Sequence, residues 1–487
     1  MINVLFATSE VHPLVKTGGL ADVSGSLPPA LRALGYDIRL VVPAYPQALS
    51  RCERPTLARF LDLPGATTPV RIFESTLPDT DVPLYLVDCP AYFDRSGDLY
   101  GDGKADWPDN PQRFTLFSRA VVALARGHIG LGWSPEVVHC NDWQTGLVPA
   151  LLSLEGYRPK TIFTIHNLSY QGLFPWGTFV DLNLPMALWS PESMEFYGKV
   201  SFIKGGLVHA DLLTAVSPTY AREICTPAFG YGLEGLLGAR VNHLVGILNG
   251  ANYSYWDPRN DTFLPYRYTP TDFSGKAANK AALQRRLGLP VRPKVPLLGF
   301  IGRLVEQKGF DLVLAGLPDL FQHPLQVVVL GSGDKLIEQE IRDLAARFPT
   351  QIAVRIGYDE ELAHLVEAGA DAFVMPSRFE PCGLNQLYSL RYGTLPVVRR
   401  TGGLADTVVD ATPENIANER ATGFVFDAAT PSALTATLAR ALNLYYNHQD
   451  AWRGMMEVAM LADYSWTVSA RHYSDLYQRA IGTYAPS

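Results

Sequence analysis

The chain has 487 residues, of which 47% are hydrophobic and 18% charged, and its formal net charge is −7. A chain of this length exceeds what one hydrophobic core usually organises, so we expect two or more domains of ordinary globular composition. The net negative charge excludes a general basic field, and we predict neither a nucleic-acid partner nor a membrane partner.

The first residues and the cysteines indicate a compartment. The chain begins MINVLF, without a basic segment or a small-residue cleavage site, and no apolar run reaches about 18 residues. The five cysteines are scattered and form no Cys-x-x-Cys pair; they are Cys52, Cys89, Cys140, Cys225 and Cys382. We therefore expect a cytoplasmic protein with reduced thiols.

Short apolar runs alternate along the chain with longer stretches of helical spacing. Candidate strands in the first half are residues 3–8, 38–42, 84–88, 137–140, 161–166, 212–216 and 245–248, and in the second half residues 297–302, 326–330, 353–356, 372–375, 395–398 and 423–426. Most of these runs are unbroken Val, Ile, Leu and Phe, which is typical of parallel strands covered on both faces. The pattern predicts two doubly wound α/β domains.

The stretch from residue 249 to residue 296 has the weakest periodicity. It contains four X-Pro pairs, Asp257-Pro258, Leu264-Pro265, Thr269-Pro270 and Leu289-Pro290, and it reads as a linker. We therefore place the end of the first domain near residue 248. In open α/β sheets ligands bind beyond the carboxyl ends of the strands, so a cleft between two such sheets is the expected site.

One hexapeptide occurs twice: Thr17-Gly18-Gly19-Leu20-Ala21-Asp22 returns as Thr401-Gly402-Gly403-Leu404-Ala405-Asp406. Each copy follows an apolar run and precedes a segment with helical spacing. Adjacent glycines let backbone N–H groups approach a ligand, and a helix start adds partial positive charge, so both loops suit anions and sugar hydroxyls. Convergent turn chemistry is the alternative explanation.

Cations follow one of the predicted strands. Arg303 comes directly after residues 297–302, and Lys308 stands five residues later. The two could grip a diphosphate, and Lys16 could supply a third charge. A solvated helix start is the alternative, but cations there oppose the helix dipole, which favours the ligand-binding interpretation.

A carboxylate and a histidine follow other strands. Glu380 stands in a turn between Phe379 and Pro381, where it could contact sugar hydroxyls and stabilise positive charge, or cap the next helix. In the first half, His166 and Asp142 follow neighbouring strands. His139 could equally be a satisfied core residue.

Metal and nucleotide-loop motifs are largely missing from the sequence. Asp79-Thr80-Asp81 has the Asp-x-Asp form of metal-dependent glycosyltransferases, but it lies between prolines in a predicted turn. Asp98, Asp102, Asp106 and Asp109 lack calcium-loop spacing, and no His pair has zinc-site spacing. Gly331-Ser332-Gly333-Asp334 lacks the Gly-Lys-Ser/Thr of a nucleotide P-loop. We predict no metal site.

An ordered set of motifs resembles the bacterial glycogen synthases, the ADP-glucose-dependent glycogen and starch synthase family. It comprises Lys16 to Asp22, Asn141-Asp142-Trp143, Thr164-Ile165-His166-Asn167, Leu248-Asn249-Gly250, Gly302-Arg303-Leu304, Gln307-Lys308-Gly309, Ser377 to Leu384, Arg400 to Leu404, and Tyr464-Ser465-Trp466. The resemblance covers nearly the whole chain.

The resemblance implies a GT-B architecture, with two Rossmann-like domains facing a deep interdomain cleft. It implies a retaining transferase that adds glucose from ADP-glucose to the non-reducing end of an α-1,4-glucan such as glycogen, with no cofactor and no essential metal. The expected parts are an acceptor-side domain over 1–248, a linker and donor-side domain over 249–460, and a helix over 461–487 that crosses back to the first domain.

The motifs yield a set of candidate site residues. Catalytic candidates are Glu380, Arg303, Lys308, His166 and Asp142. Donor-binding candidates are Lys16, Gly18, Gly19, Asp22, Asn249, Tyr358, Cys382, Gly383, Leu384, Thr401, Gly402 and Gly403. We expect the cations and glycine-loop N–H groups to stabilise the leaving diphosphate, Glu380 and His166 to contact the sugar, and Tyr358 to stack on adenine.

Two positions depart from the family pattern. Many retaining relatives carry a second Glu where this chain has Tyr388, and the family commonly has Asp where it has Asn252. Two other functions stay open: a UDP-sugar-dependent retaining transferase with a small acceptor, and a non-catalytic protein that binds glucan or nucleotide sugar. The sequence leaves the oligomeric state undetermined.

Overall fold

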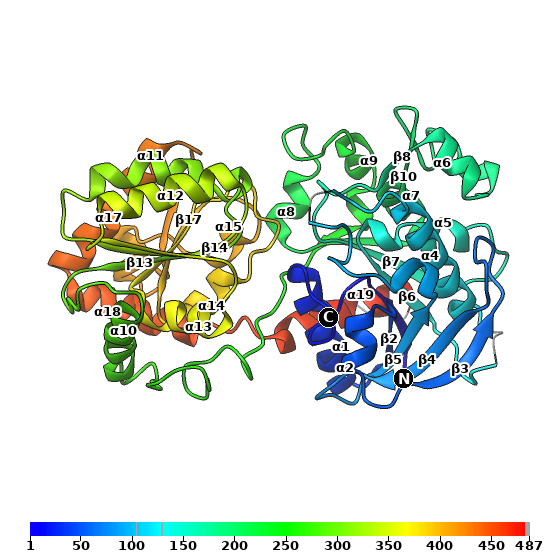
Figure 1. Cartoon of the computed structure of the whole chain (residues 1–487), viewed down its shortest axis with the longest axis horizontal. Coiled ribbons are helices and arrows are strands. Elements are labelled where there is room, and N and C mark those ends of the chain that lie inside the picture. Colours follow the sequence, from blue (N-terminus) through cyan, green and yellow to red (C-terminus); the bar gives the residue numbers. More distant parts are fainter. Residues whose placement is uncertain (104, 128–129, 483–487) are drawn as a thin grey trace. The chain divides into compact units, whose positions relative to one another are not determined.

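The computed structural model describes residues 1–103, 105–127 and 130–482. The chain divides into two compact units (Figure 1). Unit 1 comprises Met1–Gly250 together with the chain from Trp466 onward, and unit 2 comprises Ala251–Ser465. Unit 1 is built around a mostly parallel sheet and unit 2 around a parallel one, and the two-domain α/β class predicted from the sequence is confirmed.

The main sheet of unit 1 has the strand order β12-β11-β7-β6-β1-β2-β5-β4-β3. Its strands are β1 (Asn3–Ala7), β2 (Asp37–Pro43), β3 (Thr56–Leu61), β4 (Val70–Thr76), β5 (Pro83–Asp88), β6 (Val137–Asn141), β7 (Lys160–Ile165), β11 (Leu212–Ala215) and β12 (Leu244–Gly246). Neighbours from β12 to β5 run parallel, whereas β5, β4 and β3 form an antiparallel edge.

The strands β3 and β4 and a small antiparallel sheet were not predicted from the sequence. That second sheet has the order β8-β10-β9, formed by β8 (Leu173–Pro175), β10 (Lys199–Ser201) and β9 (Glu195–Phe196). Most residues of β3 are exposed. An exposed strand has no continuous apolar run in its sequence, so β3 is recognised only from its pairing with β4 in the structure.

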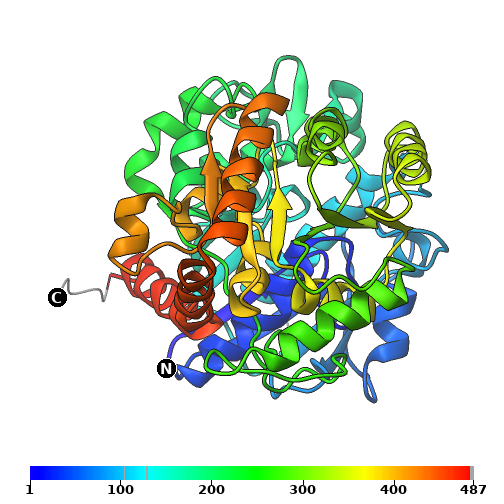
Figure 2. The same ribbon diagram turned by 90° about the vertical axis from the view of Figure 1, so that its left-hand side faces the viewer.

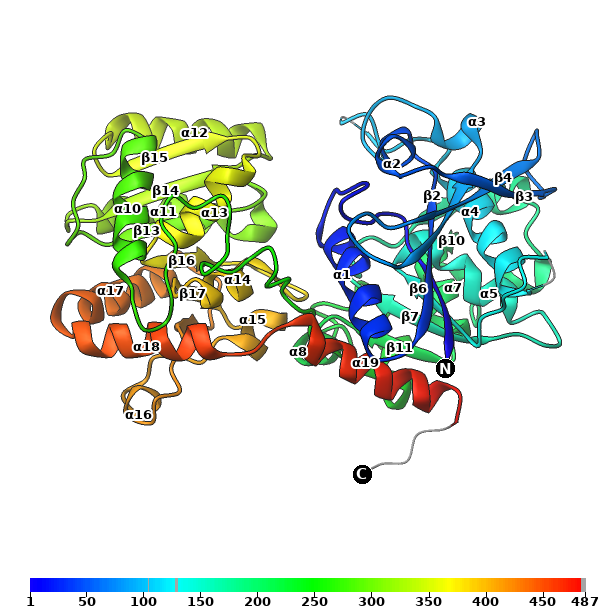
Figure 3. The ribbon, with the colours of Figure 1, turned by 90° about the horizontal axis from the view of Figure 1, so that it is seen from below.

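Helices cover the sheet of unit 1. They are α1 (Gly19–Ala33), α2 (Pro46–Arg51), α3 (Pro90–Phe93), α4 (Asn110–Ala125), α5 (Leu147–Leu152), α6 (Trp176–Asp181), α7 (Phe202–His209), α8 (Pro218–Glu223), α9 (Glu234–Ala239) and α19 (Trp466–Ala480), with short 3-10 turns at Trp143–Thr145, Met186–Leu188 and Val241–His243. The last helix, α19, lies beside α1 (Figure 3). It buries Tyr477, whose hydroxyl lies 2.7 Å from Nδ1 of His139 in β6.

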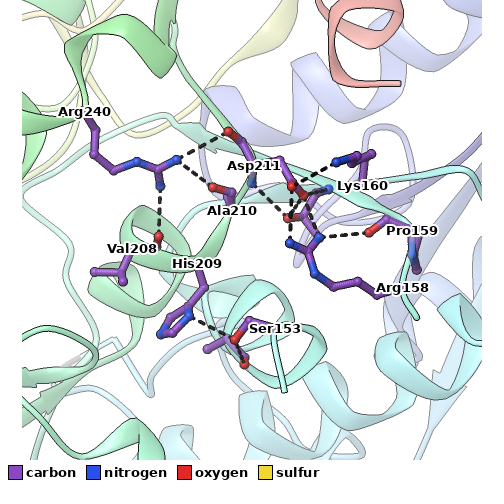
Figure 4. A network of polar contacts seen from close by, with 11 residues as sticks. Ser153, Arg158, Pro159, Lys160, Val208, His209, Ala210, Asp211 and Arg240 are labelled. Carbon is purple, nitrogen blue, oxygen red and sulfur yellow. Dashed lines mark hydrogen bonds and ion pairs between the residues drawn. The ribbon is translucent and has the colours of Figure 1, made fainter. Parts of the chain in front are cut away.

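A polar cluster lies at the amino ends of β7 and β11, the edge of the sheet opposite the candidate site (Figure 4). The Asp211 carboxylate accepts bonds from the Arg158 guanidinium at 2.6 Å and from the Thr161 N–H at 2.7 Å. Burial opposes the charge, but these donors outweigh it and lower the pKa of Asp211. Arg240 donates to the carbonyls of Val208 and Ala210 at the end of α7. These contacts hold the starts of β7 and β11 together.

Unit 2 contains a parallel sheet of order β15-β14-β13-β16-β17-β18 with helices on both faces (Figures 1 and 2). Its strands are β13 (Leu297–Ile301), β14 (Gln326–Gly331), β15 (Ile352–Ile356), β16 (Ala372–Met375), β17 (Leu395–Arg399) and β18 (Phe424–Phe426). Successive residues of β13 enter different cores: Leu298 and Phe300 pack in one, Leu297 in the other. This two-sided burial is why the strands read as unbroken apolar runs.

The helices of unit 2 are α10 (Ser274–Arg286), α11 (Phe310–Leu320), α12 (Lys335–Arg347), α13 (Glu360–Gly369), α14 (Asn385–Arg391), α15 (Gly402–Thr407), α16 (Pro413–Ala417), α17 (Pro431–Asn447) and α18 (Gln449–Leu461), with a 3-10 turn at Glu306–Lys308. After α18 the chain stays with unit 2 as far as Ser465, and the Ala251 N–H donates to the Tyr464 carbonyl at 2.7 Å. Within the described ranges, no helix is both long and apolar enough to span a bilayer.

Candidate active site

In unit 1, Asp142 and His166 follow the paired strands β6 and β7. Asp142 has a positive φ of 56°, and its Oδ1 accepts the His166 N–H at 2.7 Å and the Asn167 N–H at 3.4 Å. Burial raises the pKa of the Asp142 carboxyl to about 7, although both N–H donors oppose the rise. Asp142 therefore holds the turn that carries His166.

The hydrogen bonds of Asn141 determine the tautomer of His166. The Asn141 amide nitrogen donates to the Ala7 carbonyl at 3.0 Å, which turns its oxygen towards Nε2 of His166 at 2.9 Å. Because that oxygen can only accept, Nε2 carries the hydrogen and Nδ1 is an acceptor. Burial lowers the pKa of His166 to about 3, so the imidazole is neutral and can accept a bond from a sugar hydroxyl.

The first glycine loop is held from both sides. On one side, Nζ of Lys16 pairs with Oδ1 of Asp22 at 2.8 Å. On the other, the N–H groups of Thr17 and Gly18 donate to Oε2 of Glu10 at 2.6 and 3.2 Å. In this structure the Gly18 N–H donates to a carboxylate of the same chain, and its contact with a ligand stays a prediction. The first turn of α1, which begins at Gly19, retains N–H groups without intrahelical partners.

Glu10 is a site residue that the sequence analysis missed. It stands three residues beyond the end of β1, at the same edge of the sheet as Asp142 and His166. An acidic side chain just beyond a buried strand was the available signal, because that is where ligand-binding residues gather in such folds.

In unit 2, Glu380 and Lys308 form an ion pair. Nζ of Lys308 lies 2.5 Å from Oε2 of Glu380, and the Ser377 hydroxyl donates to the same oxygen at 3.0 Å. Glu380 is 6% exposed. The two side chains were predicted to serve different parts of a ligand, and the structure also joins them to each other.

Arg303 follows β13 and Tyr358 follows β15, the two strands on either side of β14, and both residues are exposed. An Arg303 amino group donates to the Gln307 side chain at 3.3 Å, and the side chain of Tyr358 is 77% exposed. An exposed ring beyond a strand end offers a face for stacking.

The second glycine loop lies against the turn that carries Glu380. Gly402 has a φ of 44°, and a Cβ there would lie 1.9 Å from the Glu380 carbonyl oxygen. The Gly403 N–H donates to the carbonyls of Glu380 and Pro381, each at 3.2 Å. The Gly403 N–H thus has partners within unit 2, and its contact with a ligand stays a prediction. These glycines, with the buried Thr401, let two strand-end loops pack closely.

The segment Cys382-Gly383-Leu384 leads from that turn into α14, where Cys382 is buried. On α14, the Tyr388 ring stacks on Trp256 with centroids 4.2 Å apart, and Trp256 stacks on His364 at 3.7 Å. Tyr388, which stands where many relatives carry a second Glu, is thus part of an aromatic stack.

Asn249 and Asn252 flank the change from unit 1 to unit 2. The Asn249 side chain is buried, and its Oδ1 lacks a hydrogen-bond partner within the described chain. The oxygen of Asn252 accepts bonds from the N–H and hydroxyl of Ser254 at 3.1 and 2.6 Å. Asp would make the same turn, so this departure from the family pattern preserves the local geometry.

Two other features lie apart from these groups. Asp81 pairs with Arg32 at 3.2 Å in the turn between β4 and β5, and in the described ranges no cluster of three or more His, Cys, Asp or Glu side chains could hold a metal ion. An open cavity of about 410 Å³ in unit 1, lined in part by Glu192, Glu195 and Tyr197, contains none of the predicted site residues.

Comparisons with known proteins match nearly the whole chain. The family model of the starch synthase catalytic domain matches residues 3–239, and that of glycosyl transferases group 1 matches residues 285–454. Glycogen synthase 1 of Methylococcus capsulatus is 55% identical over 99% of this chain and 97% of its own length. The glycogen synthase of Thioalkalivibrio sulfidiphilus is 56% identical over 98% of this chain and 99% of its own.

Solved structures extend the comparison to the fold. The catalytic domain of starch synthase IV from Arabidopsis thaliana, bound to ADP and acarbose, superposes with a TM-score of 0.87 at 33% identity, covering 99% of both chains. Sucrose-phosphate synthase from Thermosynechococcus elongatus, at 17% identity and a TM-score of 0.59 over 99% of this chain and all of its own, shares the fold alone. The chain therefore belongs to the glycogen and starch synthase family of glycosyltransferases, which have the two-domain GT-B fold.

Proposed function

We propose that this protein is a glycogen synthase that transfers glucose from ADP-glucose to the non-reducing end of an α-1,4-glucan, with retention of configuration. Family membership over the full chain supports the activity. The ADP in the starch synthase IV structure supports an adenine nucleotide donor. The observation that carries the proposal is the Lys308–Glu380 pair, a cation and a carboxylate joined where strands of unit 2 end.

Breaking the bond between glucose C1 and the diphosphate develops negative charge on phosphate and positive charge on the sugar ring. Arg303 and Lys308 stabilise the phosphate charge, with Lys16 and the first turn of α1 as further donors. The ammonium of Lys308 has three hydrogens, so it can keep its bond to Glu380 while donating to a phosphate oxygen.

Glu380 binds the donor glucose. Lys308 and Ser377 both bond Oε2, which fixes the carboxylate, and Oε1 accepts a bond from a glucose hydroxyl. The Glu380 charge also stabilises the developing oxocarbenium ion. His166 accepts a second sugar hydroxyl through Nδ1, and Asp142 orients donor or acceptor by holding the turn of His166.

The remaining candidates bind the rest of the donor. Tyr358 stacks on adenine, and the segment Cys382-Gly383-Leu384 carries the start of α14 towards the nucleotide sugar. Thr401 and Gly402 hold that segment in place, while Asn249 offers its unpartnered Oδ1 to the donor. The cleft expected from the resemblance stays a prediction.

Retention of configuration requires either two displacements or attack from the face of the leaving group. A double displacement needs a nucleophilic carboxylate opposite the diphosphate. Tyr388 stands where a second Glu would be, inside an aromatic stack. We therefore favour attack on the leaving-group face, with a phosphate oxygen taking the proton of the acceptor hydroxyl. A trapped covalent glucosyl-enzyme would overturn this step.

The test is transfer of labelled glucose to glycogen, with chelator present, from ADP-glucose and in parallel from UDP-glucose. Digestion of the product with an α-1,4-specific amylase reports the linkage. Preference for ADP-glucose with digestible label supports the proposal, and Glu380→Gln serves as the control with strongly reduced activity. Preference for UDP-glucose would reject the donor assignment. Binding of both donors without transfer to glycogen would reject the acceptor.

A further inference from the structure

Glu10 is a buried carboxylate whose protein contacts are all hydrogen-bond donors. Its residue is 4% exposed. Oε2 accepts the N–H groups of Thr17 and Gly18, the Thr17 hydroxyl lies 2.9 and 3.0 Å from the two oxygens, and the Tyr100 hydroxyl donates to Oε1 at 3.2 Å. Among the described residues, no Lys or Arg forms an ion pair with it.

Neutral donors alone therefore compensate the burial of this charge. Burial raises the pKa of Glu10, and the bonds from Thr17 and Gly18 oppose the rise. A buried carboxylate without a counter-ion is costly unless its oxygens are fully bonded. Gln has the same shape but would turn an NH₂ group towards a donor, so the contact set specifically requires a carboxylate.

The contacts of Glu10 determine which side of the glycine loop faces outward. They turn the N–H groups of Thr17 and Gly18 inward, while a Cβ built on Gly18 would meet no atom within 4 Å. Lys16 lies just before this bonded pair and α1 begins directly after it. The Glu10 carboxylate thus bonds the backbone that joins Lys16 to the first turn of α1, while the Lys16 ammonium itself pairs with Asp22.

We propose that Glu10 is a positioning residue for the donor: its carboxylate clamps the loop 16–19 so that Lys16 and the start of α1 are preorganised for a diphosphate. This inference rests on the proposed function, because the diphosphate belongs to the nucleotide-sugar donor. The clamp itself is a property of unit 1 without a ligand. Glu10 acts through the loop, and its removal weakens donor binding because the loop must then be ordered on binding.

The test compares Glu10→Gln with the wild-type protein in three measurements. Amide hydrogen exchange of residues 15–22 reports the loop, calorimetry with ADP reports nucleotide affinity, and initial rates separate the KM for ADP-glucose from kcat and from the KM for glycogen. We expect at least tenfold faster exchange in the loop, about tenfold weaker ADP binding and a similar rise in donor KM. kcat and the KM for glycogen should change by less than threefold.

Two further variants complete the design. Glu136→Gln makes the same chemical change at a carboxylate that accepts the Asn3 N–H at 3.0 Å, and it should leave all three measurements within twofold. Lys16→Ala should weaken ADP binding by itself and add little to Glu10→Gln, because both act through one loop. If Glu10→Gln does not fold, Glu10→Asp keeps the charge with a shorter reach and should show the same effects at smaller size.

Unchanged loop exchange in a folded Glu10→Gln protein would overturn the clamp. Faster exchange with unchanged ADP affinity would overturn the link to the donor, and a rise in the glycogen KM alone would assign Glu10 to the acceptor. If the wild-type protein neither binds ADP nor transfers glucose, the proposed function fails, whereas the exchange measurement still decides whether Glu10 holds the loop.

Discussion

The ion pair between Lys308 and Glu380 leads to the sharpest prediction about catalysis. Nζ and Oε2 are 2.5 Å apart, and the two side chains are 24% and 8% exposed. Removing one partner of a fully buried pair costs about 3–5 kcal/mol. Because Lys308 keeps access to solvent, we expect Lys308→Ala to lower the free energy of unfolding of unit 2 by about 2 kcal/mol. Ser377 partly compensates the remaining carboxylate.

The loss of transition-state stabilisation in these variants should be larger than the loss of folding stability. It should also come from two separate interactions, one with phosphate and one with the sugar. If Lys308 stabilises phosphate and Glu380 stabilises the sugar, each single variant removes an interaction made mainly in the transition state. We expect kcat to fall about hundredfold for Lys308→Ala and for Glu380→Gln, and a hundredfold fall corresponds to about 2.7 kcal/mol.

The assay is a double-mutant cycle over the wild type, the two single variants and the double variant. Urea unfolding should show a coupling of about 1–2 kcal/mol, because the side chains touch. Because the two side chains touch, the losses in kcat should add only in part: the double variant should be slower than either single variant but should lose less than about ten-thousandfold. A double variant no slower than either single one would refute the separate roles, and an unchanged kcat in a folded single variant would remove that residue from catalysis.

Three further changes test other parts of the site. Tyr358→Ala should raise the KM for ADP-glucose with little change in kcat, and a defect confined to kcat would argue against stacking. Gly403→Ala should cost about 1–3 kcal/mol of stability, because its Cβ would lie 2.0 Å from the Cys382 carbonyl oxygen; Gly454→Ala, which meets no atom within 4 Å, is the control. Burial lowers the pKa of His139 from 6.5 to about 3. Its contribution to stability is therefore complete above pH 6.5 and is lost as the pH falls towards 3, by about 2 kcal/mol at pH 5. His139→Gln should flatten urea-derived stability against pH by that amount, and parallel curves would contradict the buried neutral imidazole.

The sequence predicted the buried strands of the fold better than its edges. Strands covered on both faces, such as β13 and β14, can be recognised in the sequence because most of their residues are apolar. The edge strand β3 reads Thr-Leu-Ala-Arg-Phe-Leu and is mostly exposed, so burial imposes no pattern on it. Its existence depends on pairing with β4, a relation between two segments that no local window contains.

Strand ends identified most of the candidate site for the same physical reason. Asp142, His166 and Lys308 were found because polar groups leaving buried strands need a partner, and a ligand is one such partner. The bonds that join these residues could not be foreseen. Nothing local in the sequence shows that Asp142 accepts the His166 N–H, or that Lys308 reaches Glu380 across 72 positions of chain.

The two copies of the repeated hexapeptide have the same sequence but different hydrogen-bond partners. In both copies a glycine N–H that was expected to meet a ligand donates to a glutamate of the same unit. In unit 1 the acceptor is the side chain of Glu10, whereas in unit 2 it is the backbone carbonyl of Glu380. In unit 2 the Glu380 carboxylate pairs with Lys308, whereas in unit 1 the Glu10 carboxylate holds the glycine loop. The same six residues therefore contain a helix start in both copies, and the acceptor atom differs: a side-chain carboxylate at Glu10 and a backbone carbonyl at Glu380.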